Sequence, residues 1–553
     1  MDMAEPELMP KPVRSDWSFL LKLVGALTLA GIAQGLFVFQ RGGATIGGFA
    51  LLLLIVAALL RPVLWRNRGA RLALAAAAFF SLVLAADPGP LALLLYWTML
   101  TVAALLPQAA RFGDGWRWTL RLIVHGVLSP FMPIRDLILL NKARSRRGAG
   151  GVGRLLAVLT LPLLGTLLFL ALFAAANPLI ENFLTSIDAT VSPRTIVRLI
   201  FAGLIFLAAW SLLRPPRLRL AAISSEAAFG PGNALPGISP ASIAISLCAF
   251  NLLFAVQNGL DLAFLWSGAR LPGDLTLAGY AHRGAYPLIA TALLAGLFVL
   301  VTLRPGSETA RSGGIRLLVT LWIAQNLLLV ASTMYRTFDY IESYSLTVLR
   351  IAALIWMGLV AVGLVLICWR LLRNRSAAWL INANMLAALL VLAGCTCVDF
   401  GRMAAAWNVT HAREVGGRGV ELDLCYLNEL GASALVPLLE LETRPDLPVE
   451  LRDRVQWLRE RGLRELAEAQ ADWHGWTLRG AGRLATAQAI AAAHRLPAPR
   501  PLNRQCDGRE RIPEPPPAAA LAPVESNEGA TEENVAEPDG NVATAPLTGN
   551  AAR

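Results

Sequence analysis

Residues 346–369 read LTVLRIAALIWMGLVAVGLVLICW, and this stretch decides the fold. It holds one charged residue, Arg350, and it is long enough to cross the ~30 Å hydrocarbon core of a bilayer, which takes about 20 helical residues. A spanning segment must satisfy its backbone hydrogen bonds internally, because lipid offers no partners. The stretch therefore predicts a transmembrane α-helix.

Ten further apolar runs of comparable length occur in the chain, which has 553 residues, 56% of them hydrophobic and 16% charged. A soluble protein carries about 25% charged residues. We therefore predict an all-α fold: a polytopic membrane bundle of about eleven helices over 17–398, with a small extracytoplasmic helical domain after it. The runs lie near 17–39, 44–65, 70–86, 89–110, 155–176, 194–213, 239–264, 283–303, 315–334, 346–369 and 378–398.

The distribution of Lys and Arg predicts the orientation of this bundle. With residues 1–16 as a cytoplasmic N-terminus, the loops on that side hold 24 of these residues, whereas the opposite loops and helix ends hold seven. Positively charged loops remain in the cytoplasm. An odd number of helices then places everything after about residue 399 outside. The net charge of +11 follows from this bias, and it does not indicate nucleic-acid binding, because the arginines lie between apolar runs.

The longest cytoplasmic loop, 111–154, begins with Trp116 and Trp118 and ends in a basic run. Tryptophan prefers the headgroup level, and arginine pairs with lipid phosphate. We expect an interfacial amphipathic segment in contact with the bilayer, and a docking site for another protein is the alternative. Contacts with anionic lipids are expected at Arg144, Arg146 and Arg147.

The composition changes after residue 399. Gly431 suits a left-handed helix end, and Ser433 suits the cap of the next helix. A third helix opens near Pro448. We predict an extracytoplasmic helical domain over 399–496, and a disordered tail over 497–553, where Pro, Ala and Glu dominate. The apolar face of the third helix is expected at Leu451, Val455 and Leu458.

Sequence motifs exclude several classes of activity. There is no phosphate-binding G-x-x-x-x-G-K loop, no H-E-x-x-H and no G-x-S-x-G, so the common ATPases, zinc peptidases and serine hydrolases are not indicated. The six cysteines lack metal-binding spacing, and neither a metal nor a cofactor is expected. For Cys425 and Cys506, a disulfide and two unpaired thiols both fit the sequence.

Polar residues recur at the expected outer ends of the helices between 239 and 369. Asn251, Asn258 and Asp261 share one helix face, which must point into the bundle rather than at lipid. A charged group in the bilayer usually has a partner, and we expect Arg283 to be the partner of Asp261.

The stretch 315–357 contains neither Gly nor Pro, so its first helix is expected to continue to about Glu342. Arg350 would then face Glu342 or Asp339 across the following turn. These charges either lock the helices together or line a pocket for an anion, a lipid headgroup or a substrate. The candidate cluster is Asp261, His282, Arg283, Arg336, Asp339, Glu342 and Arg350.

Two stretches, HRGAYPL at 282–288 and YIESYSLTVLR at 340–350, resemble a family of bacterial multi-pass membrane proteins catalogued only as a domain of unknown function. Its signature is E-x-Y-[GS]-L-T-x-L-R, and the position of Ser345 is usually Gly. Residues 399–409 and 422–427 are also similar, and the resemblance covers about 240–440. It implies a bacterial inner membrane and a multi-pass architecture, and it implies no activity.

Two functional interpretations stay open from the sequence. The first is a non-enzymatic transport, sensing or scaffold protein with a polar site facing the periplasm. The alternative is a membrane-embedded enzyme that acts on a lipid-linked envelope substrate, with Asp339, Glu342 or His282 as acid or base.

Overall fold

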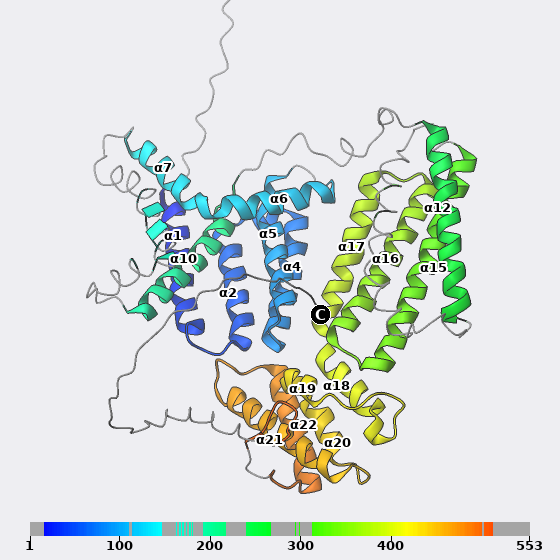
Figure 1. Cartoon of the computed structure of the whole chain (residues 1–553). Helices are drawn as coiled ribbons and strands as arrows, with labels where there is room; N and C mark the ends of the chain where they lie inside the picture. The colour runs from blue at the N-terminus through cyan, green and yellow to red at the C-terminus, as the bar shows by residue number, and fades with distance from the viewer. Residues whose placement is uncertain are drawn as a thin grey trace, which may run out of the picture. The chain divides into compact units, whose positions relative to one another are not determined.

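Every regular element that the computed structural model describes is a helix, and no β-strand occurs among these residues, which confirms the predicted all-α fold. Figure 1 shows the helices in groups that are described here in turn. The described residues are 16–109, 113–145, 192–216, 239–266, 312–499 and 503–511, with a few single positions between 162 and 180 and at 294 and 298.

The first group consists of long apolar helices that pack along one another. α1 (Asp16–Phe37) lies along α10 (Pro193–Leu213), and α2 (Ala44–Leu60) lies along α4 (Arg68–Ala86), which also packs on α5 (Pro90–Leu105). Their buried contact surfaces are mostly alanine and leucine. Small side chains let helices approach closely, and this packing drives association where lipid is as apolar as the helices themselves.

One buried arginine ties three helices of this group together. Arg61 directly follows α2, and its Nη1 donates to the carbonyl of Leu212 (2.7 Å) while Nη2 donates to that of Ala104 (2.9 Å). These carbonyls belong to the last turns of α10 and α5, where acceptors are left without intrahelical partners and the helix dipole is negative. The guanidinium therefore fixes the ends of α10 and α5 against the end of α2.

α6 (Gly115–Leu128) and α7 (Met132–Ser145) follow, joined by a 3-10 turn. Figure 1 shows α6 running across the direction of α4 and α5. α6 buries Trp118 and His125, as expected of an amphipathic segment, and its place at the membrane surface stays a prediction. Arg144 lies in α7, while Arg146 and Arg147 fall outside the described residues. The large exposed side chains of α6 are Trp116, Ile123 and Val127.

The second group comprises α12 (Pro240–Asp261), α15 (Gly313–Tyr344), α16 (Val348–Arg373) and α17 (Ala377–Cys397). α15 packs on α12 and on α16, and α16 packs on α17. α15 runs for 32 residues without interruption, which confirms that this helix continues past the expected membrane surface.

Nine helices within the described residues are long and apolar enough to cross a membrane, so the chain is a multi-pass membrane protein. Ala44–Leu60 is apolar but shorter, and the runs expected near 155–176 and 283–303 lie outside the described residues apart from single positions. The nine are Ser18–Phe37, Arg68–Ala86, Pro90–Gln108, Gly115–Leu139, Pro193–Leu213, Pro240–Asp261, Gly313–Tyr344, Val348–Arg373 and Ala377–Cys397. Eight of them correspond to expected membrane helices, whereas Gly115–Leu139, which includes α6, was expected in the interface.

A domain of shorter helices follows α17. It contains α18 (Phe400–His411), α19 (Leu424–Glu429), α20 (Leu435–Glu442), α21 (Val449–Ala471) and α22 (Leu478–His494). α20 is buried on nearly all sides and contacts α18, α21 and α22. The domain therefore folds around this short apolar helix, with α18, α21 and α22 packed against it.

Of the two helix boundaries predicted at Gly431 and Ser433, one is confirmed and the other is wrong. Gly431 has a φ of 56°, as expected of a left-handed helix end. Ser433 does not cap α20: it lies in a 3-10 turn, and Ala434 holds the cap position without a side-chain bond. The 3-10 turn leads directly into α20, which leaves no place for a side-chain cap. Three residues expected on the apolar face of α21 are buried: Leu451, Val455 and Leu458.

We predict that Arg61→Ala lowers the free energy of unfolding by about 2 kcal/mol, because it removes two charge-assisted hydrogen bonds from helix ends. The measurement is thermal or denaturant unfolding of the full chain in detergent. Arg66→Ala, in the exposed part of the same connector, is the control and should change little. Equal effects of the two variants would contradict the role given to Arg61.

Candidate functional site

A polar stripe runs along the contact between α12 and α15. Asn251, Asn258 and Asp261 of α12 are 7%, 3% and 0% exposed, which confirms that this face points into the protein. Opposite them on α15 lie Gln325 and Arg336, with Arg336 3% exposed. The stripe is therefore built from two helices that are far apart in sequence.

The charged end of the stripe is an ion pair between Asp261 and Arg336. Nη2 of Arg336 donates to Oδ1 of Asp261, which also accepts from Nε2 of Gln257 at 3.0 Å. We expected Arg283 as the partner of Asp261, but Arg283 and His282 lie outside the described residues. The pairing across helices follows because α15 packs parallel to α12, so that Arg336, in the C-terminal part of α15, lies beside Asp261 at the end of α12.

Amide side chains continue the stripe toward the middle of the helices. Asn251 accepts from Nε2 of Gln325 at 2.8 Å and donates to the carbonyl of Leu318 at 3.0 Å. Asn258 donates to the carbonyl of Gln325 at 3.1 Å. These bonds tie α12 to α15, so the helix-locking interpretation accounts for the contacts. The sequence analysis missed Gln325, although an amide in an apolar run is itself a signal of a buried contact.

Three buried amide oxygens have no hydrogen-bond partner within the described residues, two of them in the stripe and one on the residue next to Gln325. They are Oδ1 of Asn258, Oε1 of Gln325 and Oδ1 of Asn326. A buried polar atom without a partner costs about 1–3 kcal/mol. These oxygens can accept hydrogen bonds from a ligand or a buried water. The observation favours the pocket interpretation, whereas the bonds between α12 and α15 favour the helix-locking interpretation.

The outer end of the candidate cluster differs from the expectation. Arg350 does not pair with Glu342 or Asp339. Its Nη1 donates to the carbonyls of Tyr344, at 2.6 Å, and Ser345. The cation therefore caps the end of α15, where helix carbonyls lack partners. Five of the seven candidate residues are described, and these five do not form one site: Asp261 pairs with Arg336, whereas Arg350 bonds to the turn.

The backbone turn at Ser345 directs the carbonyls of Tyr344 and Ser345 toward Arg350. Ser345 has a φ of 70°, a conformation that strains any residue with a Cβ and that glycine adopts freely. In the family that the chain resembles, this position is usually glycine, which adopts the conformation without strain. The serine of this chain therefore adds backbone strain to the turn.

A second set of charges, which the sequence analysis missed, joins the C-terminal domain to the membrane helices. Arg479 of α22 donates to Oδ2 of Asp87 at 2.7 Å and to the carbonyl of Cys397 at 2.9 Å. Asp87 ends α4, and Cys397 ends α17. One arginine thus bonds the domain to two membrane helices at once.

Arg483 lies one turn further along α22 and pairs with Asp399, the N-cap residue of α18. It also donates to Oγ of Ser433 at 3.1 Å. Burial raises the pKa of Asp399, but the hydrogen bonds from the Arg402 amide and from Arg483 outweigh it, and the net pKa is lowered. A lowered carboxyl pKa means that the stabilisation is complete above about pH 4 and is lost as the pH falls through the folded-state pKa. Together, Arg479, Arg483, Asp87 and Asp399 form what we call the arginine clamp.

The turn before α22 makes a further contact, with the loop between α1 and α2. The amide of Ala44 donates to the carbonyl of Trp476 at 2.7 Å. A Cβ at Gly43 would lie 2.5 Å from the carbonyl oxygen of His474, so only glycine permits this approach. The domain therefore contacts two loops of the first helix group, the one between α1 and α2 and the one that follows α4.

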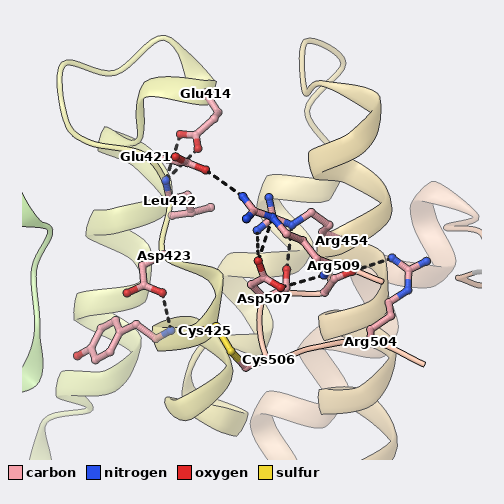
Figure 2. Close-up of polar contacts among 12 residues, drawn as sticks. Glu414, Glu421, Leu422, Asp423, Cys425, Arg454, Arg504, Cys506, Asp507 and Arg509 are labelled. Carbon is pink, nitrogen blue, oxygen red and sulfur yellow. Dashed lines mark hydrogen bonds and ion pairs between the residues drawn. A yellow bond between two sulfur atoms is a disulfide. The ribbon is translucent and has the colours of Figure 1, made fainter. Parts of the chain in front are cut away.

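A strap of residues 503–509 lies along α21, beyond the boundary at 496 that we expected for the domain. Cys506 forms a disulfide with Cys425, which decides between the two states left open by the sequence. Figure 2 shows Arg454 bonded to Asp507 beside this disulfide, at 3.0 Å between Nη2 and Oδ2. On the other side of the strap, Arg504 pairs with Asp453 at 2.6 Å. The charges that hold the strap lie on α21 and, for Arg509, at Glu421, and composition alone does not reveal them.

A family model described as Domain of unknown function (DUF4153) matches residues 71–441, well over half of the chain. The chain belongs to this family. No curated protein and no solved structure matches it. The resemblance noted from residues 240–440 is thereby confirmed, and the family domain reaches further toward the N-terminus, into α4.

The limits of the family domain divide the arginine clamp. Asp87 and Asp399 lie inside the matched region, whereas Arg479 and Arg483 lie beyond its end at residue 441. The polar stripe of α12 and α15 lies wholly inside. The family domain thus supplies the acceptors of the clamp, and the C-terminal helices supply the donors.

We predict that breaking the Asp261–Arg336 pair by either Asp261→Asn or Arg336→Gln lowers the free energy of unfolding by about 3 kcal/mol, because each change leaves an uncompensated buried group. The double variant should recover part of this loss in a double-mutant cycle. Glu342→Gln, on the exposed face of the same helix, is the control. Strictly additive losses would show that the two side chains are not coupled.

We also predict that Ser345→Gly raises the free energy of unfolding by about 1 kcal/mol, since it relieves the left-handed strain of the turn. Ser343→Gly, two residues earlier inside α15, should lower it by about 0.5–1 kcal/mol, because glycine weakens a helix interior. Unfolding in detergent measures both. A destabilised Ser345→Gly variant would mean that the serine side chain matters more than the backbone strain.

Proposed function

We propose that this chain is a non-enzymatic scaffold of the bacterial inner membrane, which holds a small helical domain rigidly on the periplasmic face. The observation that carries the proposal is the arginine clamp. Two arginines of α22 make its contacts. Arg479 donates to acceptors at the ends of α4 and α17, and Arg483 pairs with the residue that caps α18. A domain tethered only by the chain at residue 399 would not need these contacts.

The periplasmic orientation rests on two independent arguments. The excess of Lys and Arg in the alternate loops favours a cytoplasmic N-terminus and an eleven-helix topology. The Cys425–Cys506 disulfide lies in the C-terminal domain, and disulfides persist in oxidising compartments such as the periplasm. On the cytoplasmic side, we propose that the segment 111–154 lies in the interface, with Arg144, Arg146 and Arg147 on anionic headgroups.

The contacts favour a scaffold over the enzymatic alternative. Arg350, which an acid–base site at the outer end of α15 would need beside Asp339 or Glu342, is committed to the backbone of the turn. In contrast, the C-terminal domain contacts the membrane helices through several hydrogen bonds and ion pairs at defined positions. These contacts hold the domain rigidly on the membrane helices.

The test is the distance distribution between spin labels at Phe39, in the α1–α2 loop, and Val449, at the start of α21; both are exposed. The background lacks the four free cysteines Cys248, Cys368, Cys395 and Cys397. We expect one narrow distribution in nanodiscs, and a broad one when Arg479→Gln and Arg483→Gln are combined.

Arg464→Gln, an exposed arginine on α21, is the matched control and should leave the distribution narrow. A broad distribution in the unaltered chain would mean that the domain moves freely, and the scaffold proposal would then fail. The orientation is checked separately by a reporter that is active only in the periplasm, fused after residue 511.

A further inference from the structure

A buried guanidinium whose two terminal nitrogens have no acceptor among the described residues lies in the last turn of α16. Arg370 is 2% exposed, and its Nε donates to the carbonyl of Arg375 at 3.4 Å. Its Nη1 and Nη2 are buried and have no hydrogen-bond partner in the part of the chain that the structure describes. The two terminal nitrogens of a charged side chain are thus without the acceptors that burial ordinarily requires.

Other buried arginines of the chain show what Arg370 lacks. Arg61 also follows the end of an apolar helix, and its two terminal nitrogens donate to helix carbonyls. Arg459 donates to Glu442 at 3.0 Å and to the carbonyl of Pro497 at 2.6 Å. Burial of an uncompensated charge costs several kcal/mol, so an acceptor from outside these residues is the physical expectation at Arg370.

The surroundings of Arg370 are positively charged. Arg316, whose Nη2 donates to the carbonyl of Leu371 at 3.3 Å, comes from the start of α15. Exposed Arg373 and Arg375 follow at the end of α16. Residues 309–338 and 343–398 contain no Asp or Glu. The neighbouring stretches of chain therefore add positive charge and no carboxylate.

The start of α17 adds a further attraction for anions. Ser376 caps this helix and is six residues from Arg370 along the chain. A helix N-terminus carries a partial positive charge and free amide donors, and it favours an anion together with the arginines.

We propose that Arg370, with Arg316, Arg373 and Arg375 around it, binds a phosphate group. A guanidinium matches phosphate in bidentate geometry. The phosphate comes either from an anionic phospholipid, since the site lies where the apolar helices α16 and α17 end and begin, or from a soluble phosphate. Because Nη1 and Nη2 are buried, binding requires a side-chain movement that brings Arg370 and the anion together.

The test compares the thermal unfolding of the full chain with two probes. The first is phosphatidylglycerol against phosphatidylcholine in nanodiscs, and the second is inorganic phosphate against chloride at equal ionic strength in detergent. We expect the midpoint of the unaltered chain to rise by several degrees with at least one probe. A response to the lipid alone identifies a headgroup site, and a response to inorganic phosphate identifies a site for soluble phosphate.

Arg370→Met should abolish this rise, and without probe it should be at least as stable as the unaltered chain, because it removes an uncompensated buried charge. Arg66→Gln, an exposed arginine in another connector, should keep the full rise. If Arg370→Met does not fold, Arg370→Lys keeps the charge without the bidentate geometry and should lose at least half of the rise.

Three outcomes overturn the proposal. The first is the absence of any rise with either probe, and the second is a rise that Arg370→Met or Arg370→Lys leaves intact. The third is a loss of stability in Glu308→Gln, without probe, that equals the loss in Arg370→Met. Glu308 is the last carboxylate before α15, eight residues ahead of Arg316 in the sequence, and that result would make it the acceptor.

Discussion

Within a bilayer a polar group cannot turn toward water, and each buried one must find its partner in the protein or in a ligand. The placement of the helices in this chain depends on how its buried cations meet that constraint. Arg61 uses the carbonyls of two helix ends, and Arg336 uses a carboxylate on another helix. Each solution joins segments that are distant in sequence. The apolar surfaces alone would allow neighbouring helices to slide or rotate, whereas these bonds define one register.

The same physics operates where the C-terminal domain meets the membrane helices. The arginine clamp and the approach of Gly43 to the turn before α22 act on different loops, so together they restrain rotation as well as separation. Asp399 has a role even without an arginine, because its Oδ1 accepts from the amide of Arg402 and caps α18. A family domain that ends at residue 441 can therefore keep this acid for local reasons, and the C-terminal helices can use it as an anchor.

The fold was predictable where one local signal decides it. Apolar runs of about 20 residues identified the membrane helices, and the lack of Gly and Pro between 315 and 357 predicted the long α15. The face shared by Asn251, Asn258 and Asp261 was also predictable from helical spacing. The partners of the charged side chains were not predictable from the sequence. The position of Arg350 depends on the left-handed turn at Ser345, and the meeting of Arg479 with Asp87 depends on the packing of segments nearly 400 residues apart. Neither arrangement leaves a pattern in the sequence.

The disulfide between Cys425 and Cys506 has a topological consequence for the domain. It closes a covalent ring that contains α20, α21 and α22, with its two ends 81 residues apart in the chain. A single cut within that ring, for instance in the connector between α20 and α21, would open it without separating the fragments. Helix α22, which carries both clamp arginines, would remain attached to the membrane helices through the sulfur atoms. The domain can thus be cut once by a protease and still stay in place.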